Sequence, residues 1–253
     1  MSQLEARDLS LRIGGRLLCE GLTLSIRAGE CWGILGPNGG GKTSLLHCLA
    51  GLRAADAGQV QLQGRPLQQH SRQHIARHIG LLLQDNHDPF PATVRETVLS
   101  GRHPHLSRWQ NEGPDDQLRA DQAMRAMELE ALAPRMVQTL SGGERRRLAI
   151  ATLLAQDPDY LLLDEPLNHL DLRHQQQLLS MLAPLQERQK AIAMVLHEPN
   201  HALHYCDQVL LLYGDGRWES GNSKKILNVE RLSALYQCQL RESQDAQGRW
   251  FHF

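Results

Sequence analysis

The feature that most constrains this chain is a glycine-rich run followed directly by lysine and threonine. It reads Gly36-Pro37-Asn38-Gly39-Gly40-Gly41-Lys42-Thr43 and fits the G-x-x-x-x-G-K-T pattern of phosphate-binding loops. Glycines let the backbone curl so that successive N–H groups point at phosphate oxygens. Lys42 can reach the β- and γ-phosphates, and the Thr43 hydroxyl can ligate Mg²⁺. We therefore predict that the chain binds a nucleoside triphosphate.

The residues on either side of this loop have the context that the loop requires. Cys31–Leu35 is a short apolar run that predicts a buried strand. Residues 44–50 predict a helix that opens at Ser44 and ends at Gly51. A helix N-terminus adds partial positive charge next to a bound phosphate. Residues 36–44 are therefore the predicted nucleotide-binding segment.

Composition argues against several other classes of protein. The 253 residues carry a formal net charge of −1, so no general electrostatic attraction to nucleic acid is expected. No apolar run approaches the roughly 20 residues that a membrane helix needs, and residues 1–7 lack a signal-peptide core. The five cysteines are scattered without C-x-x-C pairs, which predicts reduced thiols and a cytosolic protein.

The remaining patterns predict an α/β fold in which strands and helices alternate. Antiparallel strands are expected at residues 4–11 and 22–26, with a turn at Gly14-Gly15. Further strands are expected at 58–64, 79–83, 160–163, 191–196 and 209–213, and helices at 71–77, 172–185 and 231–236. A tail hairpin is expected to turn at Gln247-Gly248. Such alternation is typical of a mainly parallel sheet covered by helices, here with an antiparallel flank.

Residues 85–139 differ in texture from the rest of the chain. Proline, histidine and charged residues dominate as far as Asp116, and the apolar residues beyond it have weak helical periodicity. We interpret this stretch as a helical subdomain inserted between two strands of the core. The expected division of a single domain spanning residues 1–253 is a core at about 1–85 and 157–253, with helices at about 86–156.

A pair of carboxylates follows one buried strand. Asp164 and Glu165 come directly after Leu161-Leu162-Leu163. An acid at a strand end fits the Mg²⁺ side of a nucleotide site, and a neighbouring carboxylate can orient or deprotonate the attacking water. This pair predicts hydrolysis rather than binding alone.

A second glycine-rich turn, preceded by leucine, lies between the phosphate loop and the carboxylates. It reads Ser141-Gly142-Gly143-Glu144 and precedes an arginine-rich helix. These four residues match the signature motif of the ATP-binding cassette (ABC) superfamily, which the sequence resembles over nearly its whole length. Gln84 stands at the Q-loop position, residues 168–171 (Asn-His-Leu-Asp) resemble the D-loop, and His197 resembles the switch histidine.

The resemblance implies a P-loop ABC ATPase domain that uses ATP and Mg²⁺. It implies that Thr43, Gln84 and Asp164 serve the Mg²⁺. Lys42, Glu165 and His197 are the implied catalytic residues, with Glu165 as general base and His197 at the γ-phosphate. The implied nucleotide-binding set comprises residues 36–44, Gln84, the signature residues 141–144 and Asp171.

The signature motif also implies a dimer. A Ser-Gly-Gly turn at a helix N-terminus is itself an anion site, so one chain would carry two phosphate-facing surfaces. In the family these surfaces meet across a head-to-tail homodimer, and each ATP lies between the phosphate loop of one copy and the signature of the other. We therefore expect dimerisation that depends on ATP.

The inserted region resembles one group within the superfamily. Residues 93–105, with their Gly-Arg-His-Pro-His end, and residues 168–175 resemble cassettes that energise uptake of iron–siderophore, haem and cobalamin. The resemblance implies integral-membrane permease subunits as partners and, through them, an external substrate-binding protein. It also implies a peripheral location at the cytoplasmic face of the inner membrane. Two alternatives are a soluble cassette of iron–sulfur cluster assembly and a non-transport cassette acting on ribosomes or DNA.

Three positions depart from the family pattern. No aromatic stands near Ile13 to stack on adenine. Either Ile13 contacts the base and Arg12 or Arg16 stacks on it, or the base is held more weakly. Gly40 replaces a common serine, which we expect to matter little, and Leu167 replaces the usual threonine.

The other conspicuous residues have simpler interpretations. We expect His103 and His105 to lie in a docking loop, and His201 and His204 on a surface helix, rather than to bind metal. Residues 145–147, all arginine, are expected to form a solvated helix face. The tryptophans are expected to be packing residues; they are Trp32, Trp109, Trp218 and Trp250.

Overall fold

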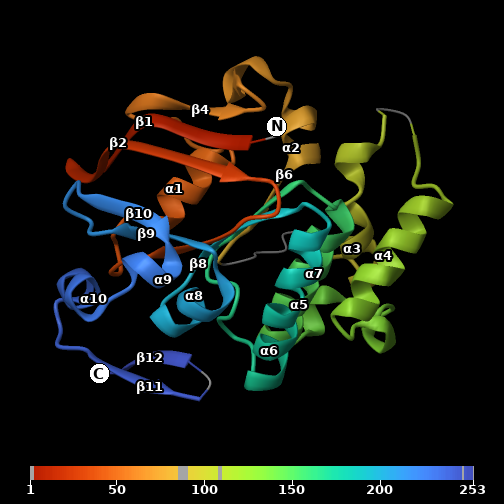
Figure 1. Cartoon of the computed structure of the whole chain (residues 1–253). Coiled ribbons are helices and arrows are strands. Elements are labelled where there is room, and N and C mark those ends of the chain that lie inside the picture. Colours follow the sequence, from red (N-terminus) through yellow and green to blue (C-terminus); the bar gives the residue numbers. More distant parts are fainter. Residues whose placement is uncertain (1–2, 85–90, 108–109, 247, 253) are drawn as a thin grey trace.

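The computed structural model describes residues 3–84, 91–107, 110–246 and 248–252 (Figure 1). Within this part of the chain, the largest sheet has six strands in the order β10-β9-β3-β8-β7-β6. All neighbouring pairs are parallel except β10 with β9. The strands are β3 (Cys31–Leu35), β6 (Ile79–Leu82), β7 (Tyr160–Leu163), β8 (Ala191–Val195), β9 (Gln208–Leu212) and β10 (Trp218–Asn222).

A second, antiparallel sheet has the strand order β2-β1-β4-β5. Its strands are β1 (Gln3–Ile13), β2 (Arg16–Arg27), β4 (Ala57–Leu62) and β5 (Arg65–Pro66). The β1–β2 turn has φ angles of 55° at Gly14 and 83° at Gly15. Glycine adopts these left-handed values without strain, and a two-residue turn of this kind matches the twist of the strands. The predicted turn is confirmed.

Helix α1 (Lys42–Leu49) lies between the two sheets. Leu45, Leu46 and Leu49 are fully buried in a cluster that contains side chains of both sheets. The helix begins two residues earlier than predicted, because left-handed Gly41, with a φ of 95°, already serves as its N-cap. Gly51 follows the helix with a φ of 71° and donates its N–H to the carbonyl of Cys48, as a glycine that ends a helix does.

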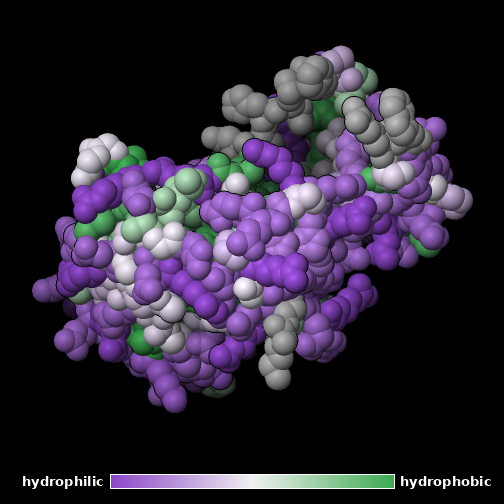
Figure 2. Space-filling model, turned by 90° about the horizontal axis from the view of Figure 1, so that it is seen from above, coloured by the Kyte–Doolittle hydropathy of each residue, from purple (hydrophilic) through white to green (hydrophobic). Residues whose placement is uncertain are grey.

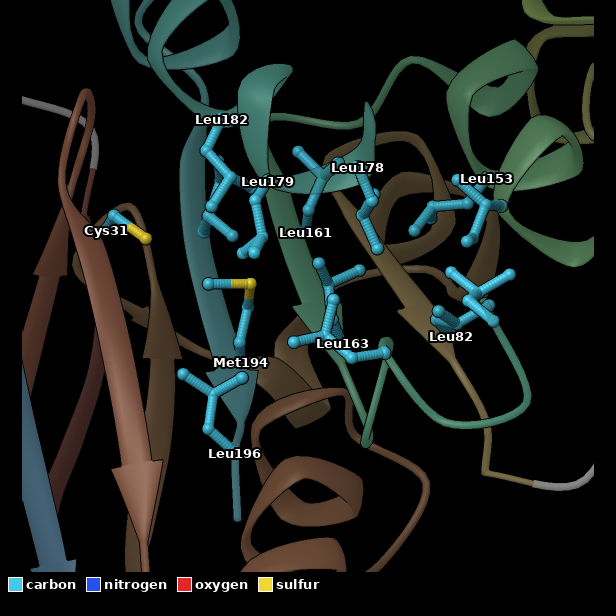
Figure 3. Close-up of a cluster of buried hydrophobic side chains, with 14 of the residues drawn as sticks. Cys31, Leu82, Leu153, Leu161, Leu163, Leu178, Leu179, Leu182, Met194 and Leu196 are labelled. Atoms are coloured by element: carbon cyan, nitrogen blue, oxygen red, sulfur yellow. The ribbon is translucent and has the colours of Figure 1, made fainter. Parts of the chain in front are cut away.

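The opposite face of the six-stranded sheet is covered by helices that include α5 (Gly142–Gln156), α6 (Leu172–Ser180), α7 (Leu182–Glu187) and α8 (Pro199–Tyr205). Figure 3 shows Leu161, Leu163 and Met194 of the sheet meeting Leu153 of α5 and Leu178 of α6 in one buried cluster. β3, β7 and β8 are buried along their whole length, as strands covered on both faces must be.

Between β6 and β7 the chain forms α3 (Val94–Ser100), α4 (Pro114–Ala126) and α5, which pack against one another at one end of the molecule (Figure 1). Arg102 joins the three helices. Its Nε donates to Asp116 Oδ1 at 2.9 Å, and its Nη1 donates to the carbonyl of Ala155 at 2.8 Å. Arg102 and Asp116 are both buried, so this ion pair is internal to the helical layer.

The remaining helices and strands refine the predicted pattern. They are α2 (Arg72–His78), α9 (Ser223–Ile226), α10 (Val229–Tyr236) and the hairpin of β11 (Arg241–Asp245) with β12 (Gly248–His252). The hairpin is confirmed, while Gln247 of its turn lies outside the described residues. The single helix predicted at 172–185 is wrong: α6 and α7 are separated at Met181. Pro184 has no N–H to donate to the carbonyl of Ser180, so the helical ladder is interrupted.

The surface of the described part is mainly polar. Figure 2 shows hydrophilic residues over most of one face, with apolar residues in small separate areas. None of the helices in the described ranges is long and apolar enough to cross a membrane. All five cysteines are free thiols, as predicted.

Candidate nucleotide site

The phosphate loop joins β3 to α1 and borders a cleft of about 470 Å³. Residues 38–44 line this cleft together with Leu18, Gln84 and Glu165. The loop needs glycine at Gly41, because its φ is 95° and an added Cβ would lie 2.9 Å from the Leu18 side chain. A Cβ on Gly40 would lie 2.9 Å from the Pro37 carbonyl oxygen, so a serine at this position would require the loop to shift slightly.

Lys42 is held by the loop that it serves. Its Nζ donates to the carbonyl oxygens of Gly36 at 2.8 Å and Pro37 at 3.0 Å, and the residue is only 5% exposed. Burial lowers the pKa of the ammonium group, while the carboxylates of Glu165 and Asp164 oppose that change. A lysine in this position places a cation at the rim of a pocket large enough for a nucleotide's phosphates.

Asp164 is a fully buried carboxylate directly after β7. Among the described residues, neither of its oxygens has a hydrogen-bond partner in good geometry. Burial raises the pKa of Asp164, and the neighbouring Thr43 hydroxyl offsets part of this rise. A buried carboxylate without donors is costly unless a cation compensates it. Mg²⁺ prefers oxygen ligands. The carboxylate of Asp164, the hydroxyl of Thr43 and the amide oxygen of Gln84 are ligands of this kind.

Glu165 follows at once and, unlike Asp164, has three polar neighbours. Its Oε2 accepts hydrogen bonds from Gln84 Nε2 at 2.9 Å and Asn168 Nδ2 at 2.5 Å. Its Oε1 lies 2.7 Å from His197 Nε2. The structure therefore brings Gln84, Glu165 and His197 together as expected. Asn168 had no separate role in the sequence analysis, although an amide three residues after the carboxylate was a usable signal.

The signature turn lies apart from this cleft within one copy. Ser141 and Glu144 form a capping box at the start of α5, and hydrogen bonds from Ser141 lower the pKa of the Glu144 carboxyl. A Cβ added to Gly142 would meet no atom of the described chain within 4 Å. Asp171 is likewise occupied locally, because its side chain accepts the N–H of His174 as the N-cap of α6. Neither the signature residues nor Asp171 are among the described residues that line the cleft.

One expectation about the arginine run is wrong. Arg145 is exposed, but Arg146 is only 4% exposed and donates hydrogen bonds to backbone carbonyls after β6 and β7. Position 146 lies four residues before buried Ile150, so helical spacing places it on the inward face. That spacing was the signal for a buried arginine.

The histidines outside the site have ordinary partners. The His105 ring lies 2.7 Å from the carbonyl oxygen of Gln156, and the His103 ring lies 3.7 Å from a Glu112 oxygen. His201 and His204 lie on α8, as expected of a helix. In the described ranges, no group of three or more histidine, cysteine or acidic side chains is arranged to hold a metal ion.

Three of the tryptophans are packing residues, as predicted. Trp32 is 7% exposed, Trp218 Nε1 donates to the carbonyl of Glu20, and the Trp250 ring centroid lies 4.3 Å from that of His204. Trp109 lies outside the described residues.

Comparison with known families decides which nucleotide-binding proteins the chain belongs with. The family described as ABC transporter matches residues 19–168, more than half of the chain. The chain belongs to the ABC transporter family. This membership agrees with the motif order and the fold, and it makes the chain an ATP-binding protein that hydrolyses ATP.

Two relatives match this ABC ATPase over most of its length. It is 37% identical over 240 residues to hemin import ATP-binding protein HmuV of Escherichia coli O157:H7, covering 92% of this chain and 91% of the relative. It is 38% identical over 240 residues to ferric enterobactin transport ATP-binding protein FepC of Escherichia coli strain K12, covering 93% and 88%.

Solved structures support the same family. A metal-chelate type ABC transporter in an inward-facing conformation has a TM-score of 0.84 and 28% identity, covering 100% of this ABC ATPase and 97% of that chain. A dimeric post-hydrolysis state of an ATP-binding cassette bound to ADP and phosphate has a TM-score of 0.74 and 25% identity, covering 85% and 97%. The predicted fold class, a P-loop ABC ATPase domain, is confirmed.

Proposed function

We propose that this protein is the ATP-hydrolysing subunit of an importer for a metal chelate such as an iron–siderophore, haem or cobalamin. The observation that carries the proposal is the likeness over most of both chains, at 37% and 38% identity, to ATPases named for hemin import and ferric enterobactin transport. The structural likeness to a metal-chelate type transporter adds to it. A soluble cassette of iron–sulfur cluster assembly, or one acting on ribosomes or DNA, has no such support here.

The proposed chemistry assigns roles to groups that line the cleft and to Asp164 and His197 beside it. Lys42 and the loop N–H groups stabilise charge on the β- and γ-phosphates. Thr43, Gln84 and Asp164 hold Mg²⁺, which neutralises phosphate charge when bound. Glu165 takes the proton of the attacking water. Gln84 and Asn168 bond one oxygen of Glu165, and His197 contacts the other. The carboxylate is therefore oriented before substrate arrives.

Among the described residues that line the cleft there is no aromatic ring to stack on the base. Ile13 and Arg16 both line the cleft, and Ile13 is 45% exposed. Arg16 Nε donates to the carbonyl of Gly214 at 2.8 Å, which fixes the guanidinium beside the loop. Arg12 is not among the described lining residues. Of the two arginines considered from the sequence, Arg16 is therefore the one we assign to stack on adenine, with Ile13 as an apolar contact.

The signature turn completes the site from a second copy. Gly142 has no left-handed φ, and its missing Cβ leaves only open space on this chain. Since none of the described residues of one copy requires glycine there, we infer that the requirement comes from outside. We assign that approach to the nucleotide of a head-to-tail partner, with Ser141, Gly143, Glu144 and Asp171 at the same interface. The dimeric cassette of similar fold is consistent with this arrangement.

The proposed assembly extends from the dimer to the membrane. The core, at about 1–85 and 157–253, carries the phosphate loop, and the helical subdomain, at about 86–156, moves against permease subunits when the dimer closes. An external substrate-binding protein delivers the chelate to that permease. The ATPase thus lies at the cytoplasmic face of the inner membrane as a peripheral subunit.

Uptake by cells tests the proposal. Cells lacking this chain are supplied with wild type, with Lys42→Ala, or with the exposed-site control Lys225→Ala, and are offered radiolabelled ferric siderophores, haem and cobalamin. We expect at least one chelate to enter only with wild type and Lys225→Ala. Unchanged uptake of every chelate after deletion would contradict an import role. Detergent co-purification of Glu165→Gln with MgATP then separates a polytopic membrane partner from a soluble cluster-assembly scaffold or ribosomes.

A further inference from the structure

Arg146 makes several hydrogen bonds to which the proposed function assigns no role. It lies on α5, one turn after the start of the helix, and its side chain is almost completely buried. Its Nη1 donates to the carbonyl of Leu83 at 2.6 Å, and its Nη2 donates to the carbonyls of Asp164 and Glu165, both at 2.6 Å. Longer contacts of 3.4 Å reach the carbonyls of Gln84 and Pro166.

These carbonyls belong to two neighbouring strand ends. β6 and β7 are parallel and paired, so the segments that follow them, 83–84 and 164–166, leave the sheet side by side. The same segments carry Gln84 and Glu165, whose side chains are hydrogen-bonded to each other. One guanidinium therefore spans the backbones of both residues. Its planar fork can bond two groups at once, which the single ammonium of lysine does with less geometric control.

The backbone at Glu165 needs such support. Its φ is 47°, a left-handed value that is unfavourable for a residue with a Cβ. Strained conformations persist at functional sites only where the surroundings over-determine them. The carbonyl of Glu165 accepts from Arg146 and also from the backbone N–H of Asn168 at 3.2 Å. These bonds fix the peptide that directs the Glu165 side chain.

We propose that Arg146 is a positioning residue that ties the catalytic strand ends to the signature helix. The helix begins with the turn that we assign to the partner's nucleotide, and the same helix then holds the backbones of Gln84, Asp164 and Glu165 through Arg146. A displacement of α5 is thereby passed directly to the general base. This inference rests on the proposed role of Glu165.

Kinetics of Arg146→Gln and Arg146→Lys test the inference, with Arg147→Gln as the matched control. Arg147 lies on the same helix and donates to the carbonyls of Met127 and Glu128, at 2.8 and 3.0 Å, but not to the strand ends. Rates are expressed per nucleotide-binding site, so that a partly unfolded preparation does not count as a slow enzyme. We expect Arg146→Gln to lower kcat roughly 10- to 100-fold, because small misplacements of catalytic groups have effects of this size.

The pattern of the other constants distinguishes positioning from a general loss of structure. In Arg146→Gln the KM for MgATP should change by less than about twofold, since the phosphate loop is untouched. Arg146→Lys should recover only part of kcat, and Arg147→Gln should keep the wild-type value. In hydrogen–deuterium exchange of nucleotide-free protein, segment 163–168 should exchange faster in Arg146→Gln than in wild type or Arg147→Gln.

Two results would overturn the inference. One is an unchanged kcat in Arg146→Gln. The other is a joint change of kcat and KM, with the same exchange pattern, in Arg146→Gln and Arg147→Gln. Failure of the general-base assignment is recognised separately, because Glu165→Gln would then hydrolyse ATP at the wild-type rate. The exchange of segment 163–168 would still report whether Arg146 holds the strand ends.

Discussion

The phosphate loop and the signature turn are two glycine-rich turns, each at the N-terminus of a helix, and they differ in what surrounds them. The phosphate loop is enclosed by its own chain: Gly41 has a left-handed φ and lies against Leu18, and Lys42 is bonded to the loop carbonyls. The signature turn is capped by its own side chains, yet no described residue lies within 4 Å of where a Cβ on Gly142 would be.

This difference separates two reasons for a glycine. At Gly41 the backbone conformation and a close neighbour within the chain require it. At Gly142 no described part of the chain does, and we attribute the glycine to the proposed approach of a partner's nucleotide to the backbone. In the proposed function, one copy thus carries the catalytic groups around Glu165, and its signature surface is completed by a second copy. The comparison predicts that changes on the two sides have different consequences for stability and activity.

The largest expected effect is at the catalytic side. Glu165→Gln should lower kcat for ATP hydrolysis by roughly 10²- to 10⁴-fold, the usual contribution of a general base. Binding of MgATP should persist, because the phosphate loop is intact. Steady-state hydrolysis and equilibrium binding measure the two quantities, with the exposed Glu187→Gln as control. Hydrolysis at the wild-type rate would remove Glu165 from the mechanism.

The helices on the signature side are joined by the buried pair of Arg102 and Asp116. Arg102→Met should lower the free energy of unfolding by about 3–5 kcal/mol, because it leaves a buried carboxylate without its partner. The exposed pair of Arg125 and Glu130 provides the control, and Arg125→Met should cost less than about 1 kcal/mol. Denaturant unfolding near neutral pH measures both.

The pKa of Asp116 predicts how the stability difference between wild type and Arg102→Met changes with pH. The hydrogen bond from Arg102 lowers the pKa of the Asp116 carboxyl below its usual value. The pair therefore contributes fully above the unfolded pKa of roughly 3.9, and its contribution is lost as the pH falls through the lower, folded value. The difference between wild type and Arg102→Met should be constant near neutrality and shrink below about pH 4. A difference that grew on acidification would contradict the pairing.

Matched substitutions of Gly41 and Gly142 test the difference between the phosphate loop and the signature turn. Gly41→Ala should destabilise the nucleotide-free protein by about 1–3 kcal/mol, the range for a residue forced into a left-handed conformation. Gly142→Ala should stay within about 0.5 kcal/mol of wild type, as surface substitutions do, yet lower ATP hydrolysis. Unfolding and hydrolysis are measured on the same preparations. Equal destabilisation by both substitutions would show that Gly142 is needed within one copy.

The smallest expected effect concerns the base. Ile13→Tyr places an aromatic ring in the cleft, and aromatic stacking contributes about 0.5–1.5 kcal/mol. The KM for ATP should therefore fall roughly two- to tenfold with little change in kcat. Arg16→Ala should raise KM instead. Insensitivity of KM to both substitutions would place the base elsewhere.

Much of this site could be predicted from the sequence because its groups lie in short motifs next to strand ends. Each of these groups follows a predicted buried strand, and parallel strands bring such positions to one edge. The loop, Gln84 and Glu165 line the cleft, and Asp164 and His197 lie beside Thr43 and Glu165. The hydrogen bond from Asn168 to Glu165 is also local, because the two residues are three positions apart. Only the role of Asn168 as a partner of Glu165 was not predicted.

What could not be predicted depends on packing between distant segments. The burial of Arg146 depends on carbonyls after β6 and β7, which charge alone does not reveal. The apolar spacing of residues 172–185 predicts one helix, and Pro184 is a weaker signal than that spacing. The separation of α6 from α7 is therefore not predicted. The strand β10 and the short helix α9 have weak periodic signals and are defined by their neighbours in the fold.

The mass of Glu165→Gln in solution tests the central claim most directly. By light scattering, the 28.5 kDa chain should be monomeric without nucleotide and should double its mass with saturating MgATP. Addition of Gly142→Arg to Glu165→Gln should abolish the dimer while MgATP still binds, because only the partner-facing surface is changed. A Glu165→Gln protein that binds MgATP and stays monomeric, or a dimer that ignores Gly142→Arg, would contradict a nucleotide site shared between two copies.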